Sequence, residues 1–479
     1  MSAKLLSLVT ATASAALLSA CAVGPKPVDP VPPLSGQGQF IGASNASVNT
    51  AEVRADWWRL FNDPVLDGLV EQALTENNQL EAAAANLRAV RASLSEARSN
   101  RLPSTTVTGA GNRSQSSTIT APAAGGAELP EVETYDVGLD VAYELDLFGR
   151  VSSAIRAAKA DARAAEAALE IVRVTVVAET TRAYADTCAL NAQVAVAERN
   201  IDLQTQTANL TQTLLDGGVG NGLDVARARA ALEQTRASLP PVLAARDAAL
   251  FRLATLTGRT PAEASQAARA CTTTPQLSQP IPVGDGAALL ARRPDIRQAE
   301  ANLAAAGARV NVATAGMFPS IRLGGSLGST AFDSSDLGNS ENFRFSVGPL
   351  ISWSFPNVIA ARARIKQADA RADAALASYD QTVLTALQET ETALSAYANE
   401  LDRQRALRVA RDQAKRAADL SRLRFDAGAD SFLSVLDAQR TLSGADAALA
   451  ASEQAVANAQ VSLFKALAGS WTGDNAPAQ

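Results

Sequence analysis

The segment Ala160-Asp161-Ala162-Arg163-Ala164 occurs a second time, unchanged, at residues 368–372 of this 479-residue chain. Other short matches recur at a similar offset of about 210 residues: Asn86-Leu87 and Asn302-Leu303, Pro103-Ser104 and Pro319-Ser320, Asp216-Gly217-Gly218 and Asp426-Ala427-Gly428. An offset of this size is far longer than a solenoid period, so it indicates a duplicated half. In each copy, alternating apolar and polar residues precede a long helical segment with a glycine-rich break. The chain is therefore expected to be one body built from two equivalent halves.

Each copy contains a very long segment that favours helix. No proline occurs at residues 151–239, where glycine is confined to a break near 217–222, and residues 357–476 again lack proline and break at Gly428. Each copy therefore begins with an unbroken helix of about 65 residues, roughly 100 Å long. After the second break, apolar residues at heptad spacing predict coiled-coil packing: Val435, Leu442, Leu449, Val456 and Leu463.

Ahead of each long helix, the sequence alternates with the period of two that is typical of a β-strand. Every second residue at 137–147 is apolar, and residues 343–355 alternate similarly, with Leu350 as an exception. Such segments match both a half-buried strand of a soluble sheet and a strand of a membrane barrel. Three acidic residues on the polar face would line an aqueous lumen or face solvent: Asp140, Glu144 and Asp146.

The number of strands constrains how such a sheet could enter a membrane. Two hairpins supply about four strands, whereas membrane barrels need at least ~8. An open sheet in lipid would leave unpaired backbone groups, each costing several kcal/mol. Closure therefore demands oligomerisation, with about eight strands in a dimer or about twelve in a trimer. The strand pattern leaves both open.

Composition narrows the function classes. Charged residues are 19% of the chain and the net charge is −6, which argues against a nucleic-acid partner because such proteins carry a basic face. Histidine is absent, which removes the usual general base and the commonest metal ligand. The three cysteines lack CxxC spacing. We therefore expect no catalytic residue, no metal site and no cofactor, and a protein that is not an enzyme.

The first residues read as an export signal. Residues 1–20 have the charge and apolar core of a signal peptide. Leu18-Ser19-Ala20-Cys21 resembles a lipobox, so Cys21 is expected to carry acyl chains such as palmitate; ordinary cleavage beside an incidental cysteine is the alternative. Ala22 is not the aspartate that typically retains lipoproteins in the inner membrane, which favours the outer membrane. Residues 21–50 read as a lipidated tether with little packing capacity.

No later segment has the ~20 consecutive apolar residues of a transmembrane helix. Membrane insertion, if it occurs, must therefore use strands.

Several motifs, in order, resemble those of one family: Asp56-Trp57-Trp58, Arg292-Arg293-Pro294-Asp295-Ile296, Met317-Phe318-Pro319-Ser320-Ile321, Arg424-Phe425-Asp426-Ala427-Gly428 and Val435-Leu436-Asp437-Ala438-Gln439-Arg440. Over about residues 50–470 the chain is similar to outer-membrane efflux factors. More narrowly, it resembles the lipoprotein branch of TolC-like proteins that serves resistance-nodulation-division pumps, the NodT-type family.

The resemblance implies a homotrimer with a twelve-stranded β-barrel in the outer membrane, continuous with a twelve-helix periplasmic α-barrel girdled by a small equatorial domain. It selects the trimer over the dimer. Substrate would pass from an inner-membrane pump of the resistance-nodulation-division type, through a periplasmic adaptor, into this lumen. The protein would be lipid-anchored in the outer membrane, with outer-membrane lipid around its strands and a long periplasmic extension.

The expected layout places an equatorial linker at 261–285 between repeats at 51–260 and 286–470, with a tail at 471–479. The expected helices are 66–102, 151–215, 222–257, 286–317, 358–425 and 432–468. The expected strands are about 103–118, 132–147, 319–332 and 343–355.

In this family frame, the glycine-rich turns would lie at the periplasmic tip. Their glycines permit tight reversals and expose backbone to which an adaptor could dock, or they are helix turns only: Gly217, Gly218, Gly220, Gly222 and Gly428.

Five residues beside the turns are candidates for a periplasmic gate. Leu433, Asp437 and Arg440 share one helical face. Three symmetry copies would form an apolar and a charged ring, although a solvated charged face is the alternative. In the other copy, Asp224 and Arg227 could pair locally or link neighbouring helices. Ser434 and Asp430 depart from the acidic and basic residues of TolC-like relatives, which leaves the bonding pattern open.

Three further expectations concern redox state and function. Because the periplasm is oxidising, Cys188 and Cys271 are expected to form a disulfide. An efflux channel is the favoured function. An exit duct of a type I secretion system and a non-conducting coiled-coil envelope lipoprotein are the alternatives.

Overall fold

The computed structural model describes residues 23–25, 30–115, 130–277, 279–355 and 357–467. The expected signal peptide, Cys21 and the tail at 471–479 lie outside this part. The chain divides into two compact units. Of the described residues, the first unit contains those within 23–30, 87–165 and 299–379, and the second contains those within 31–86, 166–298 and 380–467.

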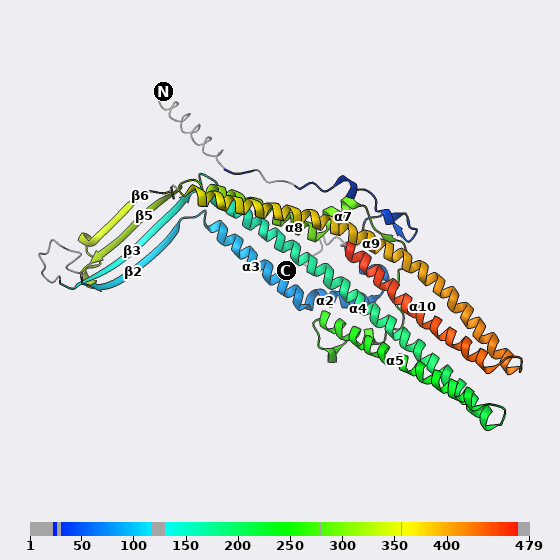
Figure 1. Ribbon diagram of the computed structural model, residues 1–479. Coiled ribbons are helices and arrows are strands. Elements are labelled where there is room, and N and C mark those ends of the chain that lie inside the picture. The colour runs from blue at the N-terminus through cyan, green and yellow to red at the C-terminus, as the bar shows by residue number, and fades with distance from the viewer. Residues whose placement is uncertain (1–22, 26–29, 116–129, 278, 356, 468–479) are drawn as a thin grey trace. The chain divides into compact units, whose positions relative to one another are not determined.

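The duplicated plan is present element by element (Figure 1). The first copy consists of α2 (Pro64–Glu76), α3 (Asn78–Ser99), β2 (Ser104–Ser114), β3 (Val132–Leu145), α4 (Arg150–Asp216) and α5 (Gly222–Leu256). The second consists of α7 (Gly286–Arg292), α8 (Pro294–Ala315), β5 (Ser320–Ala331), β6 (Phe343–Ser352), α9 (Val358–Asp426) and α10 (Phe432–Leu467). The long helices α4 and α9 contain 67 and 69 residues.

The short elements lie between these segments. They are η1 (Leu34–Gly36), η2 (Ile41–Ser44), β1 (Val48–Asn49), η3 (Trp57–Phe61), η5 (Pro261–Glu263), α6 (Gln266–Arg269), β4 (Ile281–Pro282), η6 (Ser334–Asp336) and η7 (Ser340–Asn342).

Two expected helices are each broken once, at equivalent places in the two copies. The helix expected at 66–102 is interrupted at Asn77, whose extended backbone ends α2 and whose side-chain oxygen accepts from the first N–H groups of α3. The helix expected at 286–317 is interrupted at Arg293, which is extended because Pro294 follows it. The prediction of unbroken helices here was wrong.

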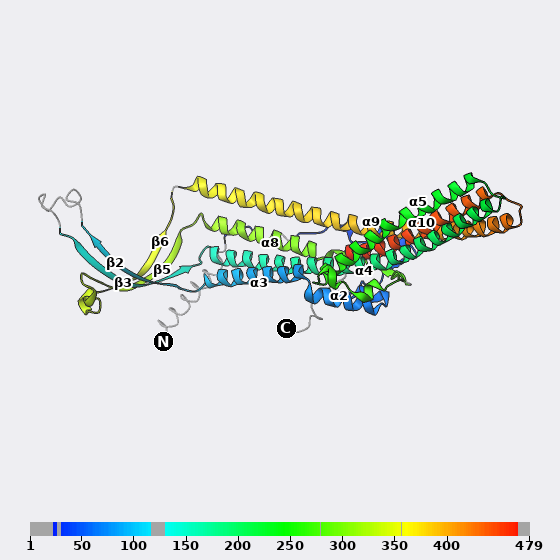
Figure 2. The same ribbon diagram turned by 90° about the horizontal axis from the view of Figure 1, so that it is seen from below.

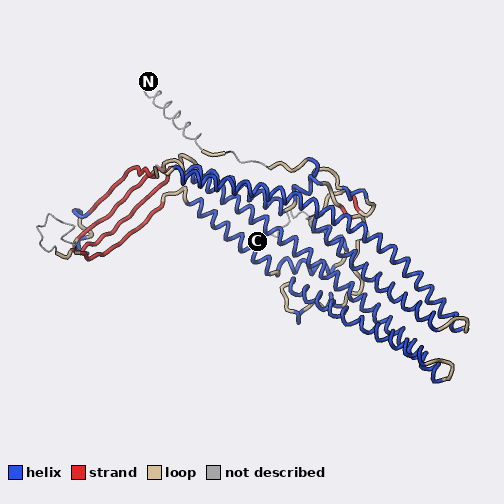
Figure 3. Tube along the Cα trace, in the orientation of Figure 1, coloured by secondary structure: helices blue, strands red, loops and turns tan. Residues whose placement is uncertain are grey.

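The main sheet of the first unit has the strand order β2-β3-β5-β6, with every neighbouring pair antiparallel. Its strands lie side by side, in red, in Figure 3. Within each repeat a hairpin joins consecutive strands, and the β3–β5 pair joins the two repeats. β2 and β6 therefore form the two edges of this sheet.

The second unit contains the largest apolar core. The Trp57 ring stacks on Phe464 of α10, with centroids 4.6 Å apart. Tyr184 of α4 donates to Asp63 at 2.8 Å, and Asp63 caps the start of α2. Burial and this hydrogen bond raise the pKa of the Tyr184 phenol. The core thus joins the long helices to the N-terminal helices.

Residues 31–53 belong to this core, although composition indicates a tether. Phe40 and Val53 are buried, and β1 pairs in parallel with β4. The Glu391 carboxylate accepts two backbone N–H groups of this segment at 2.6 and 3.1 Å. The prediction that the whole of 21–50 packs little is therefore wrong for its second half, because a few apolar residues and a distant strand hold it.

In the second unit, α5 runs beside the end of α4, and α10 runs beside the end of α9 (Figure 2). Phe432 and Leu436 of α10 share an apolar cluster with Ala228 and Leu232 of α5. The two helical hairpins therefore pack against each other near their turns. Across the described ranges, no helix combines the length and the apolar composition needed to cross a bilayer.

Cys188 and Cys271 form a disulfide with their Cα atoms 5.0 Å apart, as expected. Asn191, one turn further along α4, donates to the carbonyl of Cys271 at 2.8 Å. Two bonds of different kinds therefore hold the segment after α6 against α4.

Replacing both cysteines with serine should destabilise this segment. A bridge that closes a loop of 83 residues stabilises by about 2–4 kcal/mol, chiefly by restricting the unfolded chain. We expect a lower melting temperature and faster tryptic cleavage after the exposed Arg269 than in the oxidised wild-type protein. Wild-type protein treated with a reductant should behave like the variant. Equal melting and cleavage of variant and wild type would contradict the assignment.

Candidate functional site

The strand register separates the side chains of the main sheet onto two faces. Asp140 of β3 lies level with Ser326 of β5, which lies level with Ser346 of β6. Because side chains alternate along a strand, this register gathers the polar positions on one face: Thr106, Thr108, Asp136, Asp140, Glu144, Arg322, Ser326, Thr330, Arg344 and Ser346. The other face is largely apolar: Val107, Val137, Leu139, Val141, Ile321, Leu323, Leu327, Phe343, Phe345, Val347 and Ile351.

Among the described residues, several apolar side chains of this sheet remain exposed. Val347 is 83% exposed, and Phe345 and Ile351 are also exposed. An exposed apolar face of this size marks a contact with lipid or protein. Leu350, the exception in the alternation, lies on the polar face beside Arg322.

The polar face carries charges of both signs. Asp136 accepts from Arg344 and from Thr330, each at 2.7 Å. Glu144 pairs with Arg150 and lies 3.7 Å from Arg322. Of the acidic residues expected on this face, Asp140 and Glu144 are on it, and arginines balance Glu144.

Asp146 lies one residue beyond β3, so its expected place on the strand is wrong. Its carboxylate accepts from the backbone N–H groups of Val151 and Ser152 at 2.8 and 2.7 Å. Burial opposes ionisation, but these bonds and the Ser152 hydroxyl together lower the pKa of Asp146. An acidic residue ahead of a helix is a cap signal, and the strand alternation concealed it.

The two glycine-rich turns reverse the chain at the ends of the long helices. Gly218 and Gly428 have φ of +78° and +70°, which side chains rarely adopt. Gly220 has an ordinary φ, but a Cβ there would lie 2.8 Å from the Leu215 nitrogen. Gly217 and Gly222 have ordinary φ values as well. Three of the five turn glycines are therefore needed by the backbone itself.

The candidate gate residues lie where their spacing predicts. Leu433, Asp437 and Arg440 are exposed together on α10. Neither Asp437 nor Arg440 forms an ion pair with a residue that the structure describes. In the other hairpin, Asp224 and Arg227 are 3.7 Å apart, a local pair within α5.

The two positions that depart from TolC-like relatives bond to each other. The Ser434 hydroxyl donates to Asp430 at 2.8 Å, and Arg424 lies 3.4 Å from the same carboxylate. The bond from Ser434, with one from the Ser431 N–H, lowers the pKa of Asp430. These residues stabilise the turn within one chain.

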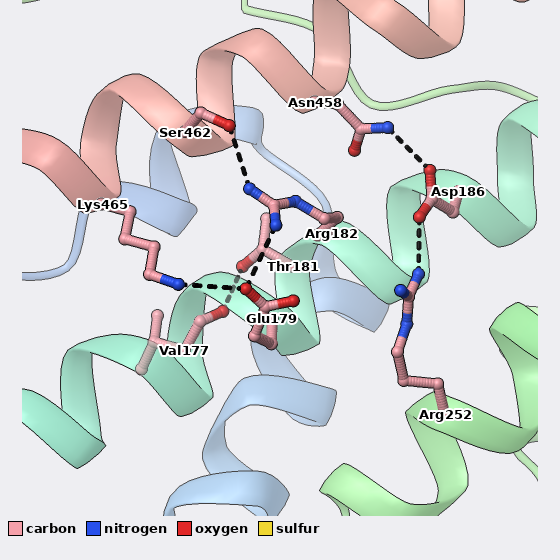
Figure 4. A network of polar contacts seen from close by, with 9 residues as sticks. All are labelled: Val177, Glu179, Thr181, Arg182, Asp186, Arg252, Asn458, Ser462 and Lys465. Carbon is pink, nitrogen blue, oxygen red and sulfur yellow. Dashed lines mark hydrogen bonds and ion pairs between the residues drawn. The ribbon is translucent and has the colours of Figure 1, made fainter. Parts of the chain in front are cut away.

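A polar network between α4, α5 and α10 was not predicted (Figure 4). Asp186 of α4 is only 7% exposed. Its carboxylate accepts from Arg252 at 2.6 Å, Gln454 at 2.7 Å and Asn458 at 2.9 Å. Two turns earlier, Glu179 accepts from Arg182 and Lys465. The sequence signal that could have indicated this network is the spacing of residues 179, 182 and 186, which places them on one face of an alanine-rich helix.

Comparisons with known proteins agree with this geometry. The model of the outer membrane efflux protein family matches residues 69–259 and 287–469. The pyoverdine export outer membrane protein OpmQ of Pseudomonas aeruginosa is 33% identical over 99% of this chain and 98% of its own. The probable efflux pump outer membrane protein TtgC of Pseudomonas putida is 32% identical over 97% and 96%. The solved outer-membrane channel OprN matches with a TM-score of 0.88 and 37% identity, covering 94% of this chain and 100% of that one.

Replacing Asp186 with alanine should loosen the second unit. The change removes a buried carboxylate that accepts three hydrogen bonds, and it leaves two amide groups without this acceptor. We expect the free energy of unfolding to fall by about 2 kcal/mol. The melting temperature of the detergent-solubilised protein, followed by circular dichroism, should fall. Asp412→Ala, which removes an exposed carboxylate from a surface pair, should leave it nearly unchanged. Equal shifts for both variants would refute the structural role of Asp186.

Proposed function

The chain belongs to the outer membrane efflux protein family, and on that premise we propose that it is the outer-membrane channel of a tripartite efflux system. It conducts solutes passively from the periplasm to the exterior, with no bond chemistry. The observation that carries this function is the sheet of the first unit, with one polar and one apolar face and two edges free to pair with other copies. Such a sheet becomes a lipid-compatible wall only when it closes.

We infer a homotrimer. Three four-stranded sheets, joined β6 to β2, give about twelve strands, which is within the range of membrane barrels. The apolar faces then meet outer-membrane lipid, and the polar faces with Asp140 and Glu144 line the lumen. The long helices continue this wall as a periplasmic α-barrel, with the core around Trp57 as its equatorial girdle.

We propose that Leu433, Asp437 and Arg440 close the periplasmic end. Asp437 and Arg440 have no ion pair within the described chain, so their charges are available to neighbouring copies. The Asp224–Arg227 pair lies just beyond the turn of the other hairpin, in the first turns of α5. Attraction between copies would hold the closed ring, and Leu433 would provide an apolar constriction.

We infer the partners from the glycine-rich turns at the same end of the helical hairpins. A periplasmic adaptor would dock on the turns at Gly217, Gly218, Gly220, Gly222 and Gly428, where exposed backbone and the exposed Val219 offer a contact surface. The adaptor would connect the channel to an inner-membrane pump of the resistance-nodulation-division type. Lipidation of Cys21 would add an anchor, because acyl chains hold a protein at a membrane without spanning it.

A pair of adjacent substitutions tests which face meets lipid. Val347→Lys places a charge on the apolar face, at a cost of about 2–4 kcal/mol near the bilayer centre, whereas Ser346→Lys places it on the lumen face. The first variant should greatly reduce the amount of assembled protein in outer-membrane fractions, and the second should not. Equal assembly of both would contradict the lipid-facing assignment.

Removing the charge of Asp437 tests the gate. In planar bilayers, Asp437→Ala should raise the conductance severalfold, because an attraction that holds the ring closed is lost. Asp419→Ala, which breaks an exposed pair with Lys415 within α9, should not change it. An unchanged conductance for Asp437→Ala would remove Asp437 from the gate.

A further inference from the structure

The second unit contains a cavity of about 540 Å³ between α4, α8, α9 and α10. This volume lies in the range of sites for drug-sized molecules. Its aliphatic part is formed by Ile171 and Val174 of α4 and by Ala393 and Ala396 of α9. The charged side chains at the cavity come from all four helices: Arg182, Arg293, Asp295, Glu389 and Lys465.

The cavity borders the apolar core at α9 and α10. On α10, Ser462 and Lys465 line the cavity, whereas Leu463 and Phe464 are fully buried in the core. The helical turn separates these pairs onto different sides of α10. Ala393 of α9 and Ala466 of α10 lie in both the core and the cavity wall. The cavity therefore adjoins the core, and Lys465 lies on a different side of α10 from Leu463 and Phe464.

Arg293 is a structural part of this cavity. Its guanidinium is 8% exposed and contacts both oxygens of Asp295 at 3.0 and 2.7 Å, Glu389 at 2.7 Å and the Ala466 carbonyl at 2.8 Å. Arg182 likewise donates to Glu179 and to Ser462. Every guanidinium nitrogen of Arg293 donates to a protein group, and two nitrogens of Arg182 do. Both arginines hold the neighbouring carboxylates in place.

Lys465 and Glu389 can each form a further ion pair. The Lys465 ammonium bonds Glu179 at 3.2 Å, and its side chain is 39% exposed; an ammonium has three donors. The Glu389 side chain is 51% exposed, and only one of its oxygens accepts from Arg293. One cation and one anion therefore face the same partly apolar cavity, from α10 and from α9.

We propose that this cavity binds an amphiphilic zwitterion, a solute with an amine, a carboxylate and an apolar body. The carboxylate pairs with Lys465, the amine pairs with Glu389, and the apolar body covers Ile171 and Val174. A purely anionic solute brings a like charge close to Glu389, and a purely cationic one brings a like charge close to Lys465. That the bound solute is one in transit through the duct rests on the proposed function, but the binding itself does not.

Three fluorescent probes that differ only in charge test this proposal. Nε-dansyl-lysine is a zwitterion, dansylcadaverine lacks only its carboxylate, and 6-(dansylamino)hexanoic acid lacks only its amine. They are titrated against the full chain in lipid nanodiscs, with empty nanodiscs as the baseline for partition into lipid. Dansyl-lysine should bind about fivefold more tightly than either analogue, the effect of one partly exposed ion pair.

Charge variants assign the two ends of the ligand. Lys465→Gln should weaken binding of dansyl-lysine about fivefold and leave dansylcadaverine bound no more weakly. Glu389→Gln should weaken binding of dansyl-lysine and leave 6-(dansylamino)hexanoic acid bound no more weakly. The glutamine at 389 keeps an oxygen for Arg293. Lys415→Gln removes an exposed lysine elsewhere on α9 and should change no affinity.

A bulky residue tests the place of binding. Ala396 is exposed at the cavity wall, so Ala396→Phe should fold normally and abolish saturable binding of dansyl-lysine. Equal affinities for the three probes, or binding unaffected by Ala396→Phe, would overturn the proposal. The same protein preparations are also reconstituted into planar bilayers. Conductance without saturable binding would refute only the proposed binding cavity. Saturable binding without conductance would refute only the proposed channel function.

Discussion

The unpaired edges of one sheet impose the main constraint on this protein. Within the described residues, β2 and β6 each pair with a strand on one side only. In water, such edges are solvated; in lipid, each unpaired N–H or carbonyl costs several kcal/mol. The exposed apolar face and the open edges therefore cannot both be satisfied by a single chain. Assembly is the step that makes the sheet compatible with a membrane.

The duplicated architecture is suited to assembly of this kind. Each half contributes one hairpin, one very long helix and one helix of 35 or 36 residues. The nearly equal helix lengths in the two halves would let the two helical hairpins stand side by side in the proposed ring. The halves differ at the turns, where α5 has an internal Asp224–Arg227 pair and α10 exposes Asp437 and Arg440 without one. The two halves thus share one architecture but expose different side chains beside their turns.

Much of the scaffold was predictable because proline and glycine mark its breaks. The long helices end within a residue or two of the predicted positions, at glycine turns whose backbone needs glycine. The breaks at Asn77 and Arg293 were missed, because the apolar periodicity continues across both and a single cap residue decides the first. The burial of Phe40 and the β1–β4 pairing depend on residues more than 200 positions away, which no local pattern reveals.

The candidate site residues likewise divide into those that a local sequence pattern predicts and those that depend on distant contacts. Strand alternation predicted the faces of Asp140 and Glu144, and helical spacing predicted the common face of Leu433, Asp437 and Arg440. Asp146 was misplaced because a helix cap and a strand position look alike one residue beyond a strand. The network around Asp186 and the cavity at Lys465 depend on contacts between four helices, so the sequence alone could show only that charged residues share a face.

Cross-linking of the sheet edges tests the central claim most directly. Thr106→Cys on β2 is combined, in separate variants, with a cysteine at Ser346, Gly348 or Leu350 on the polar face of β6, and the membranes are oxidised. The account predicts that at least one register gives covalent products of two and three chains and no larger species. Only uncross-linked chains at every register, or a series that ends at two chains, would contradict it.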